Sequence, residues 1–236
     1  MTIEDRLDQV RAEYLRRITQ GNGTLLQQVE HHLAMHQGKL LRPRILLAAA
    51  ATLGQQHLAS RRTLLLAVCV EMLHNASLLH DDVIDHAPSR RNQPSVNARW
   101  NNAVAVLVGD YHLAKIMELL DEVGDQQASR LVCDTVKTMV EAELLQQECV
   151  SQLATDHWTL DTYLKIIDGK TAALFAAAAA LGNPDYRDFG LHYGRLFQIN
   201  DDIADGEAPP FAATLLQQEK TALAAIKPLD NILNNN

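Results

Sequence analysis

The sequence predicts an all-α fold, built as a large antiparallel helical bundle. Ala, Leu, Gln and Glu recur throughout the chain, whereas aromatic residues make up only 5% of it, and this composition favours helices over strands. No proline lies between Pro94 and Pro184, so long helices can form there without a proline break. Two segments of this stretch, 103–120 and 131–145, place apolar residues at three- and four-residue spacing, which is typical of packed helices.

Glycine and proline mark the ends of the predicted helices, because Gly favours the position after a helix and Pro its first turn. About eight main helices are expected on this basis, covering roughly 2–20, 23–36, 40–54, 60–85, 95–123, 126–153, 159–181 and 185–205. With 236 residues, 47% of them apolar, the chain can bury a sizeable core. We expect one helical domain over 1–206 and a short C-terminal tail over 207–236, frayed at its polar end, 229–236.

Charge and composition narrow the class of protein. The formal net charge of -8 argues against a nucleic-acid partner, because no basic stripe is present to contact a phosphate backbone. The three cysteines lie in apolar helical segments without metal-type spacing, so reduced thiols and a cytoplasmic location are expected. The first ten residues carry acids where a signal peptide would be basic and then apolar, and no later stretch is expected to reach membrane-spanning length.

Three aspartates, Asp81, Asp82 and Asp85, follow an apolar helical segment and precede Pro88. The i, i+1 and i+4 spacing is expected to bring their carboxylates together on one side of the helix. They would lie near the helix C-terminus, where the helix dipole disfavours further negative charge. A single aspartate there is commonly a solvated helix end, but a triplet calls for a cation, and Mg²⁺ accepts hard oxygen ligands of this kind.

The same DDxxD spacing recurs at Asp201, Asp202 and Asp205, again just before a helix breaker, Gly206. Carboxylates on two helices that face each other across a bundle would hold metal ions against a diphosphate. Such a site also needs cationic side chains to bind phosphate oxygens. The candidates, each of which alone is more often a surface charge, are Lys39, Arg42, Arg44, Arg90, Arg91 and Lys170.

With these motifs the chain resembles the trans-isoprenyl diphosphate synthases, the polyprenyl synthetase family of head-to-tail prenyltransferases. The resemblance covers 25–206 and rests on GKLLRPR, EMLHNASLLHDDVID, SRRNQPSVNARW, VLVGDYHLA, VEAELLQQ, IIDGKTAALF and FQINDDIAD. It implies the all-helical isoprenoid synthase fold and a Mg²⁺-dependent enzyme that condenses isopentenyl diphosphate with an allylic diphosphate. It also implies a homodimer.

The resemblance further implies roles for individual residues. Both aspartate motifs, Asp81, Asp82, Asp85, Asp201, Asp202 and Asp205, would hold about three Mg²⁺ ions. Catalysis would depend most on Asp81, Asp82, Lys170, Asp201 and Asp202. The allylic diphosphate would be bound by Arg90, Lys170, Thr171 and Gln198, and isopentenyl diphosphate by Lys39, Arg42, His74 and Arg91. These groups would stabilise the charge that develops on the departing diphosphate, so no protein nucleophile is needed.

Product length is expected to depend on residues one helical turn before the first aspartate cluster, Ala76 and Ser77. In the family's short-chain members aromatic side chains block this level of the product tunnel, whereas both residues here are small. The expected product is therefore longer than farnesyl diphosphate, and the floor of the tunnel is expected against Met72, Met117 or Leu120.

The sequence departs from the family's pattern in two places. After the second aspartate motif, family members continue with a lysine-bearing loop and several more helices, so this chain is C-terminally shortened by comparison. We expect either a compact enzyme or a partner that covers the exposed face. The usual glycine of the family's EGE step is Ala142, a change expected to tighten nothing essential.

Alternatives stay open on the sequence alone. A class I terpene cyclase would share the first motif, but it lacks an isopentenyl site and a second DDxxD. A non-catalytic or regulatory subunit of a heteromeric synthase would fit the shortened C-terminus, although such a subunit has no need of six repelling carboxylates. Glu71 and His74 have the E-x-x-H spacing of di-iron bundles, which require a second such motif. His32 and His36 could share a metal, but exposed histidines on a polar helix face are expected instead.

Overall fold

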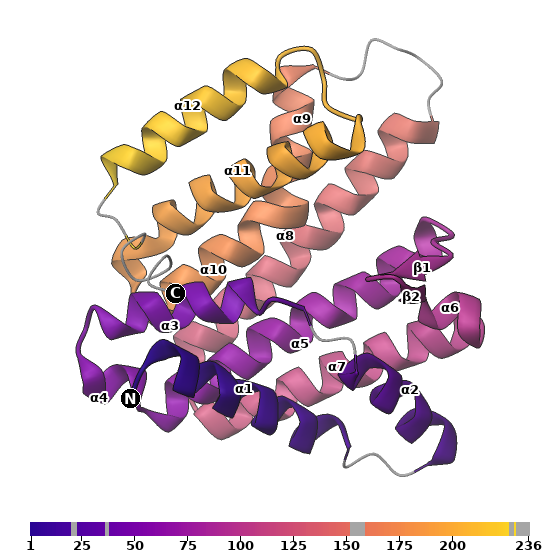
Figure 1. Cartoon of the computed structure of the whole chain (residues 1–236), viewed down its shortest axis with the longest axis vertical. Helices are drawn as coiled ribbons and strands as arrows, with labels where there is room; N and C mark the ends of the chain where they lie inside the picture. Colours follow the sequence, from indigo (N-terminus) through magenta and orange to yellow (C-terminus); the bar gives the residue numbers. More distant parts are fainter. Residues whose placement is uncertain (20–22, 36–37, 152–158, 227–228, 230–236) are drawn as a thin grey trace. The chain divides into compact units, whose positions relative to one another are not determined.

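The computed structural model describes residues 1–19, 23–35, 38–151, 159–226 and 229. Within these ranges the chain is helical apart from its loops and one short two-stranded hairpin (Figure 1), so the prediction of an all-α fold is confirmed. The chain divides into two compact units. The first comprises Met1–Arg44 and Gln55–Asp125, and the second comprises Ile45–Gly54 and Gln126–Asn236.

The first unit is built around the contact between its two long helices, α5 and α7. Its elements are α1 (Ile3–Ile18), α2 (Thr24–Ala34), α4 (Gln55–Leu58), α5 (Arg61–Ile84), the antiparallel strands β1 (Ser89–Arg90) and β2 (Gln93–Pro94), α6 (Val96–Arg99) and α7 (Asn102–Val123). α5 packs most extensively on α7 and also on α1. The side chains of Ser60 and Asn101 cap the first turns of α5 and α7, as expected for residues at the N-cap position.

α5 is the central helix of the first unit. By length and composition α5 could cross a membrane, because an 18-residue window of its 24 residues has a mean hydropathy of 1.3, so the expectation that no stretch reaches this length was wrong. In the structure 67% of that apolar window is buried. A helix that packs against neighbours on several sides is apolar all round, whether its surroundings are lipid or protein. Apolar residues of α5 such as Leu66, Val68 and Met72 have no exposed surface at all.

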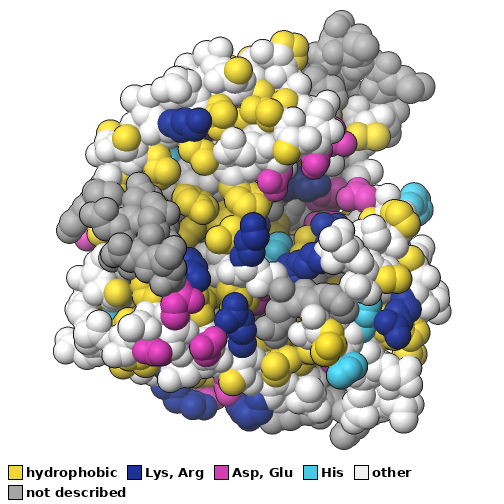
Figure 2. Space-filling model, in the orientation of Figure 1, with side chains coloured by type: hydrophobic (Ala, Val, Ile, Leu, Met, Phe, Trp, Pro, Cys, Tyr) yellow, Lys and Arg dark blue, Asp and Glu magenta, His cyan; other side chains and the backbone are white. Residues whose placement is uncertain are grey.

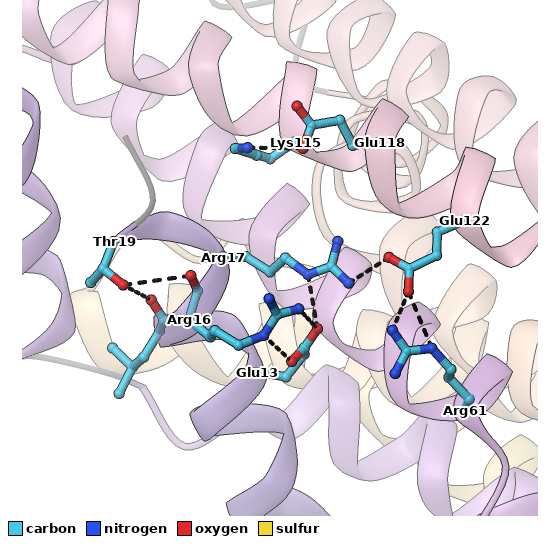
Figure 3. Close-up of polar contacts among 9 residues, drawn as sticks. Glu13, Arg16, Arg17, Thr19, Arg61, Lys115, Glu118 and Glu122 are labelled. Carbon is cyan, nitrogen blue, oxygen red and sulfur yellow. Dashed lines mark hydrogen bonds and ion pairs between the residues drawn. The ribbon is translucent and has the colours of Figure 1, made fainter. Parts of the chain in front are cut away.

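Ion pairs tie the ends of α1, α5 and α7 together (Figure 3). Arg17 on α1 donates hydrogen bonds to Glu13, at 2.8 Å, and to Glu122 on α7, at 2.5 Å. Glu122 also accepts from Arg61 in the first turn of α5. Because the side chain of Arg17 is only 10% exposed, solvent screens this network less than it screens an ordinary surface pair.

The second unit is a layered helical assembly that ends in the C-terminal helix. Helix α3 (Leu41–Ala51) begins in the first unit and contributes residues from Ile45 onward to the second. The other elements are α8 (Gln126–Ser151), α9 (Leu160–Ile167), the π-helical turn η2 (Asp168–Ala172), α10 (Ala173–Gly182), the 3₁₀ turn η3 (Pro184–Tyr186), α11 (Arg187–Asp205) and α12 (Ala212–Ala225). α10 packs on α11, and α12 packs on the other side of α11 (Figure 1).

Small residues allow α10 and α11 to approach closely. A Cβ atom added to Gly190 would lie 2.4 Å from the carbonyl oxygen of Phe175, and one added to Gly194 would lie 2.5 Å from the Cα of Ala172. Alanines occupy the facing part of α10 and are buried over 176–179. Any larger side chain at these two glycines would therefore push α11 away from the helix that follows η2.

Several elements differ from the prediction, among them the following three. The helix expected over 95–123 is broken into α6 and α7, because Asn101 is extended, with φ at -176°, and caps the second of them. The helix expected over 159–181 is interrupted by the π-helical turn η2. The tail expected after 206 contains a third unforeseen feature, the ordered helix α12, whereas residues 230–236 lie outside the described ranges.

Acidic, basic and apolar side chains are interspersed on the face of the molecule in Figure 2. Large apolar side chains are exposed on both long helices of each unit, among them Leu107 on α7 and Leu144 on α8, which are 66% and 60% exposed. This mixed face differs from the continuous basic stripe of proteins that bind a phosphate backbone.

Candidate active site

The first aspartate cluster lies where α5 ends. Asp81 and Asp82 belong to its last turn, and Asp85 is its C-cap residue. The expectation that all three carboxylates meet was wrong, since no three His, Cys, Asp or Glu side chains converge on a metal site anywhere in the described ranges. Successive helical residues point about 100° apart, so only positions i and i+4 share a face. The role of these aspartates as metal ligands stays a prediction.

Asp82 points into the protein and binds the hairpin that follows α5. Its carboxylate Oδ1 accepts hydrogen bonds from Nε of Arg90, at 2.9 Å, and from Nη2, at 2.5 Å. The side chain of Asp82 is 5% exposed, whereas that of Arg90 is 40% exposed. Asn97 donates to the backbone carbonyl of Asp82, at 2.9 Å, and so joins α6 to the same point. The middle aspartate therefore fixes the position of the arginine pair in β1 and its turn.

The arginines predicted to bind isopentenyl diphosphate surround His74 on α5. Burial lowers the pKa of His74 well below its ordinary value, and the positive charges of Arg42, Arg91 and Arg90 lower it further. His74 is therefore neutral at physiological pH and offers a hydrogen bond rather than a charge. The structure thus brings together Arg42, His74 and Arg91, three of the four residues predicted for this substrate.

Glu71 lies one helical turn before His74, and the charges of Arg42 and Arg91 act on its carboxyl as well. Burial raises the pKa of its carboxyl to about 7, although the charges of Arg42 and Arg91 oppose that rise. The iron ions of a di-iron site are bound by carboxylate oxygens and imidazole nitrogens. The neighbours of Glu71 and His74 include several arginines, which are not ligands of this kind. The E-x-x-H alternative is therefore not supported by the surroundings of Glu71 and His74.

The fourth predicted residue, Lys39, is exposed on a constrained stretch of backbone. The next residue, Leu40, is 3% exposed and has a φ of 53°, which is uncommon for a residue other than glycine. Before it, Gly38 lies against the guanidinium of Arg91, so that an added Cβ would be 2.6 Å from Nη2. The stretch that carries Lys39 is thus placed directly beside Arg91.

The histidine pair of α2 is not an exposed polar face. His32 is 8% exposed, its Nε2 lies 2.9 Å from the carbonyl oxygen of Pro94, and its ring meets Trp100 edge-on. The expectation of exposure was therefore wrong for His32, and His36 lies outside the described ranges. His32 instead lines a small cavity, about 50 Å³ in volume, together with Asp82 and the two hairpin arginines.

The residues predicted to set product length lie one turn before Asp81. Ala76 is 1% exposed, and the hydroxyl of Ser77 donates to the carbonyl of His74, at 2.9 Å. Of the residues considered for the tunnel floor, Met72 is fully buried, whereas Met117 is 70% exposed. Met117 therefore cannot close a tunnel inside the first unit.

The second aspartate cluster lies where α11 ends, at a left-handed Gly206. As in the first cluster, the middle aspartate is bound by protein groups. Oδ1 of Asp202 accepts from Gln198, at 2.7 Å, and Oδ2 accepts from the hydroxyl of Tyr163, at 2.5 Å. Burial raises the pKa of Tyr163, and its hydrogen bond to Asp202 raises it further, so the phenol stays protonated as the donor. Asp201 and Asp205 are exposed.

The π-helical turn η2 presents the predicted lysine and threonine. Lys170 forms an ion pair with Glu143 of α8, at 2.6 Å, and the hydroxyl of Thr171 donates to Gln198, at 2.5 Å. Since Gln198 in turn donates to Asp202, a continuous chain of hydrogen bonds runs from η2 to the second aspartate cluster. Single π-helical turns inside α-helices are frequent at functional sites, because they redirect side chains.

Ala142 on α8 contacts the same turn. A Cβ added to Gly169 would lie 2.3 Å from the Cβ of Ala142 and 3.0 Å from the carbonyl oxygen of Thr138. The methyl group of Ala142 fills the space beside Gly169, and whether this contact is essential stays a prediction. The absence of a side chain at residue 169 is what lets η2 lie against α8.

Residues 23–213 match the family profile of polyprenyl synthetase. The chain belongs to this family. It is 40% identical over 190 residues to an all-trans-nonaprenyl-diphosphate synthase (geranyl-diphosphate specific) of Rhodobacter capsulatus, covering 77% of this chain and 57% of that protein. It is 36% identical over 203 residues to heptaprenyl diphosphate synthase component 2 of Geobacillus stearothermophilus, covering 82% and 62%. The chain thus spans less than two thirds of the length of these polyprenyl synthetase relatives.

The fold is that of solved isoprenoid synthases. The structure of a decaprenyl diphosphate synthase from Rhodobacter capsulatus superposes with a TM-score of 0.80 at 33% sequence identity, over 89% of this chain and 68% of that one. The predicted family and the predicted fold class are therefore both confirmed.

Sequence reasoning missed several residues that position the candidate site of this chain. Glu143 pairs with Lys170, Tyr163 with Asp202, and Arg195 with Asp168 at the start of η2. A regular-helix pattern gave no signal for them, because each pair joins elements far apart in the sequence. The one available clue was the position of Glu143 in the VEAELLQQ segment, which the resemblance already included.

Proposed function

We propose that this polyprenyl synthetase is a Mg²⁺-dependent prenyltransferase that condenses isopentenyl diphosphate with an allylic diphosphate to give a polyprenyl diphosphate. The relatives named above make long-chain products of this class. Because the chain covers only part of their length, we infer its activity from its own side chains and not from the names of these relatives.

The cation cluster around His74 is the observation that supports the proposal most. Arg42, Arg90 and Arg91 all act on the pKa of this one side chain, so their positive charges are concentrated in a small region. The acids near these arginines include Asp82, which is bound by Arg90, and Glu71, whose pKa of about 7 leaves it partly neutral. Three arginines in one region suit a diphosphate, which carries several negative oxygens and matches the arginine fork.

Mg²⁺ suits the carboxylates of the two aspartate clusters. Asp81, Asp85, Asp201 and Asp205 flank the two middle aspartates, and carboxylate oxygens are the ligands that Mg²⁺ accepts alongside substrate phosphates. About three ions are expected by analogy with the family. Bound there, Mg²⁺ would stabilise negative charge that develops on the departing diphosphate.

The protein groups would share that task. Arg90 and Lys170 would bind diphosphate oxygens of the allylic substrate. The hydrogen bonds of Thr171 and Gln198 would hold Lys170 and Asp202 in the positions that this binding requires. Isopentenyl diphosphate would be held by Lys39, Arg42 and Arg91, with neutral His74 as a hydrogen-bond partner. Since Ala76 and Ser77 are small, the prenyl tail would extend past this level, and the product would be longer than farnesyl diphosphate.

The decisive experiment is incubation of the purified chain with isopentenyl diphosphate, Mg²⁺ and a series of allylic diphosphates, followed by sizing of the products. We expect products longer than fifteen carbons, which is the length of the farnesyl chain. Replacing Asp81 and Asp82 together with Ala should abolish turnover, whereas the same pair of changes at the exposed Asp8 and Asp161 should not. Failure to condense any primer would refute the enzyme proposal.

A second candidate function is a subunit of a heteromeric synthase. It is favoured by the relatives from Geobacillus stearothermophilus and Bacillus subtilis, each named heptaprenyl diphosphate synthase component 2. A chain that is inactive alone and active after addition of a second protein would support this function. Light scattering of the pure chain tests the homodimer that the family resemblance implies, and cell fractionation tests the cytoplasmic location.

A further inference from the structure

Helix α12 carries a buried acid on the face that it packs against the second unit. Its buried residues are Ala212, Leu215 and Glu219, whose spacing places them on one side of the helix. Ala212 and Leu215 join an apolar cluster with Tyr163 of α9 and Ile199 of α11. Glu219, only 5% exposed, stands where a third apolar side chain would be expected. A buried carboxylate is costly unless cations compensate it, so its partners define its role.

Both partners of Glu219 lie on α11. Oε2 of Glu219 is 2.5 Å from Nδ1 of His192, and Oε1 accepts from Nη1 of Arg195, at 3.2 Å. Arg195 uses its other two nitrogens for Asp168, with Nε donating to Oδ1 at 2.5 Å and Nη2 to Oδ2 at 2.7 Å. Arg195 therefore bridges two carboxylates, one on α12 and one on η2, and its planar fork fixes the direction of both contacts.

Asp168 is the first residue of the π-helical turn η2, which carries Lys170 and Thr171. A π-helical turn has a wider backbone loop than an α-helix, so it depends on tertiary contacts for its shape. Three side-chain polar contacts hold η2 within the described part of the chain: the pair with Arg195 at its start, the pair of Lys170 with Glu143, and the hydrogen bond of Thr171 to Gln198. Loss of the first would free the end of η2 that precedes Lys170.

A second contact joins the start of α12 to the aspartate cluster. The ring of Phe211, the N-cap residue of α12, meets the ring of Tyr163 edge-on with centroids 5.6 Å apart. Tyr163 donates to Asp202. The start and the middle of α12 thus reach residues that hold the proposed diphosphate and metal site, the start through Phe211 and the middle through Glu219.

We propose that α12 is a positioning helix of the active site, and that Glu219 acts through Arg195 and Asp168 to hold η2 in the conformation that presents Lys170. The proposal rests on the proposed prenyltransferase function, because Lys170 is assigned there to the allylic diphosphate. Glu219 touches no substrate group and is a positioning residue. Its loss should weaken binding of the allylic diphosphate while leaving isopentenyl diphosphate unaffected.

The test compares Glu219→Gln and Glu219→Ala with Arg17→Gln as a matched control. Arg17 binds two carboxylates, as Arg195 does, and is comparably buried, but both of these partners, Glu13 and Glu122, belong to the first unit (Figure 3). We expect Glu219→Ala to raise KM for farnesyl diphosphate about tenfold, with KM for isopentenyl diphosphate unchanged. Glu219→Gln, which keeps the shape and part of the hydrogen bonding, should raise it less. Arg17→Gln should leave both KM values unchanged while lowering the melting temperature.

Amide hydrogen exchange supplies a readout that does not depend on turnover. The amides of Asp168–Ala172 should exchange faster in Glu219→Ala than in the wild-type protein, and at the wild-type rate in Arg17→Gln. Equal exchange in this segment for all three proteins would overturn the proposal, as would equal rises of both KM values in Glu219→Ala. If the wild-type chain proves unable to condense substrates, the proposed function fails, and the exchange rates alone decide whether Glu219 holds η2.

Discussion

Arg90 donates hydrogen bonds through Nε and Nη2 to a single oxygen of Asp82, Oδ1, and so joins the first strand of the hairpin to the end of α5. The carboxylate is buried, whereas the guanidinium is partly exposed. Removal of Arg90 would therefore leave a charged carboxylate buried without its partner, whereas removal of Asp82 would leave a guanidinium that is partly exposed to solvent.

Arg90→Ala should lower the free energy of unfolding by about 2 kcal/mol, since it leaves the carboxylate of Asp82 without its cation. Arg90→Lys should lower it by about half as much, because a lysine supplies charge without the two-point donor geometry. Urea unfolding followed by circular dichroism measures both values. The control is Arg62→Ala, which breaks the more exposed pair with Asp125. A loss in Arg62→Ala as large as that in Arg90→Ala would contradict this account.

The pKa of Glu13 makes the first unit sensitive to acid. A hydrogen bond from Arg16 and a second from Arg17 lower this pKa from 4.5 to about 2. A carboxyl with a lowered folded-state pKa stabilises the protein above its unfolded pKa, and that contribution is lost as pH falls from about 4.5 to about 2. The loss should reach about 2 kcal/mol once solvent screening is allowed for.

Unfolding of wild-type protein and Glu13→Gln at several pH values checks this prediction. The stability difference between the two should shrink between pH 4.5 and pH 2. Asp8→Asn, which changes an exposed ion pair on the same helix, is measured alongside as the control. A wild-type and Glu13→Gln difference that stays constant down to pH 2 would exclude the assigned pKa.

Glu71 should have the opposite effect at higher pH. Burial raises its pKa from 4.5 to about 7, so the folded protein holds a proton there that the unfolded chain releases. The associated stability is fully present below about pH 4.5 and is lost as pH rises through 7. Glu71→Gln should therefore be more stable than the wild-type protein at pH 8, by about 2 kcal/mol, and close to it at pH 4.5. Glu118→Gln, at an exposed position on α7, is the control. The prediction would be refuted if the stability of the wild-type protein rose from pH 5 to pH 8 relative to that of Glu71→Gln.

Tyr163→Phe should weaken the response to Mg²⁺. The change removes the hydroxyl that orients Asp202 while keeping the ring that packs on Phe211. Residues that orient metal ligands typically change metal affinity by about tenfold or more, so the Mg²⁺ concentration for half-maximal activity should rise by about that factor. Tyr111→Phe on α7 serves as the control. An unchanged Mg²⁺ response in Tyr163→Phe would show that Asp202 needs no such support.

Ser77→Phe should shorten the product. Ser77 lies one turn before Asp81, and an aromatic ring there would occupy the space that the prenyl tail is expected to use. Ser77→Ala loses the hydrogen bond to the carbonyl of His74 but stays small, so its product should match that of the wild type. Product sizing by chromatography distinguishes the two. An unaltered product length in Ser77→Phe would show that residues at another level of the helix determine product length.

Much of the fold was predictable, because periodicity and helix-ending residues are local signals. The start of α5 is marked by Ser60 and the end of α7 by Gly124, and both are visible in the sequence. The π-helical turn was not predictable, since its cause is tertiary: Gly169 fits against Ala142, and Arg195 binds Asp168. The helix over 212–225 was unforeseen because its stability comes from the contacts of Leu215 and Glu219 rather than from a strong local pattern.

The site was predictable in its residue types and only in part in its geometry. The motif spacing identified Asp82 and Asp202 correctly as site residues, but it gave no indication that these two point inward to Arg90 and Tyr163. Which side of a helix contacts which partner depends on the neighbouring helices, and their arrangement cannot be predicted from a single sequence. The same limit applies to Glu143, whose pairing with Lys170 spans two helices.

The contact between Ala142 and Gly169 limits how this family can vary. The two positions, on α8 and η2, leave room for one methyl group between them, and here residue 142 supplies it. A Cβ atom at residue 169 would meet both this methyl group, at 2.3 Å, and the carbonyl oxygen of Thr138, at 3.0 Å, so a relative with alanine at both positions could not keep η2 in place. Position 169 should therefore stay glycine wherever position 142 carries a side chain.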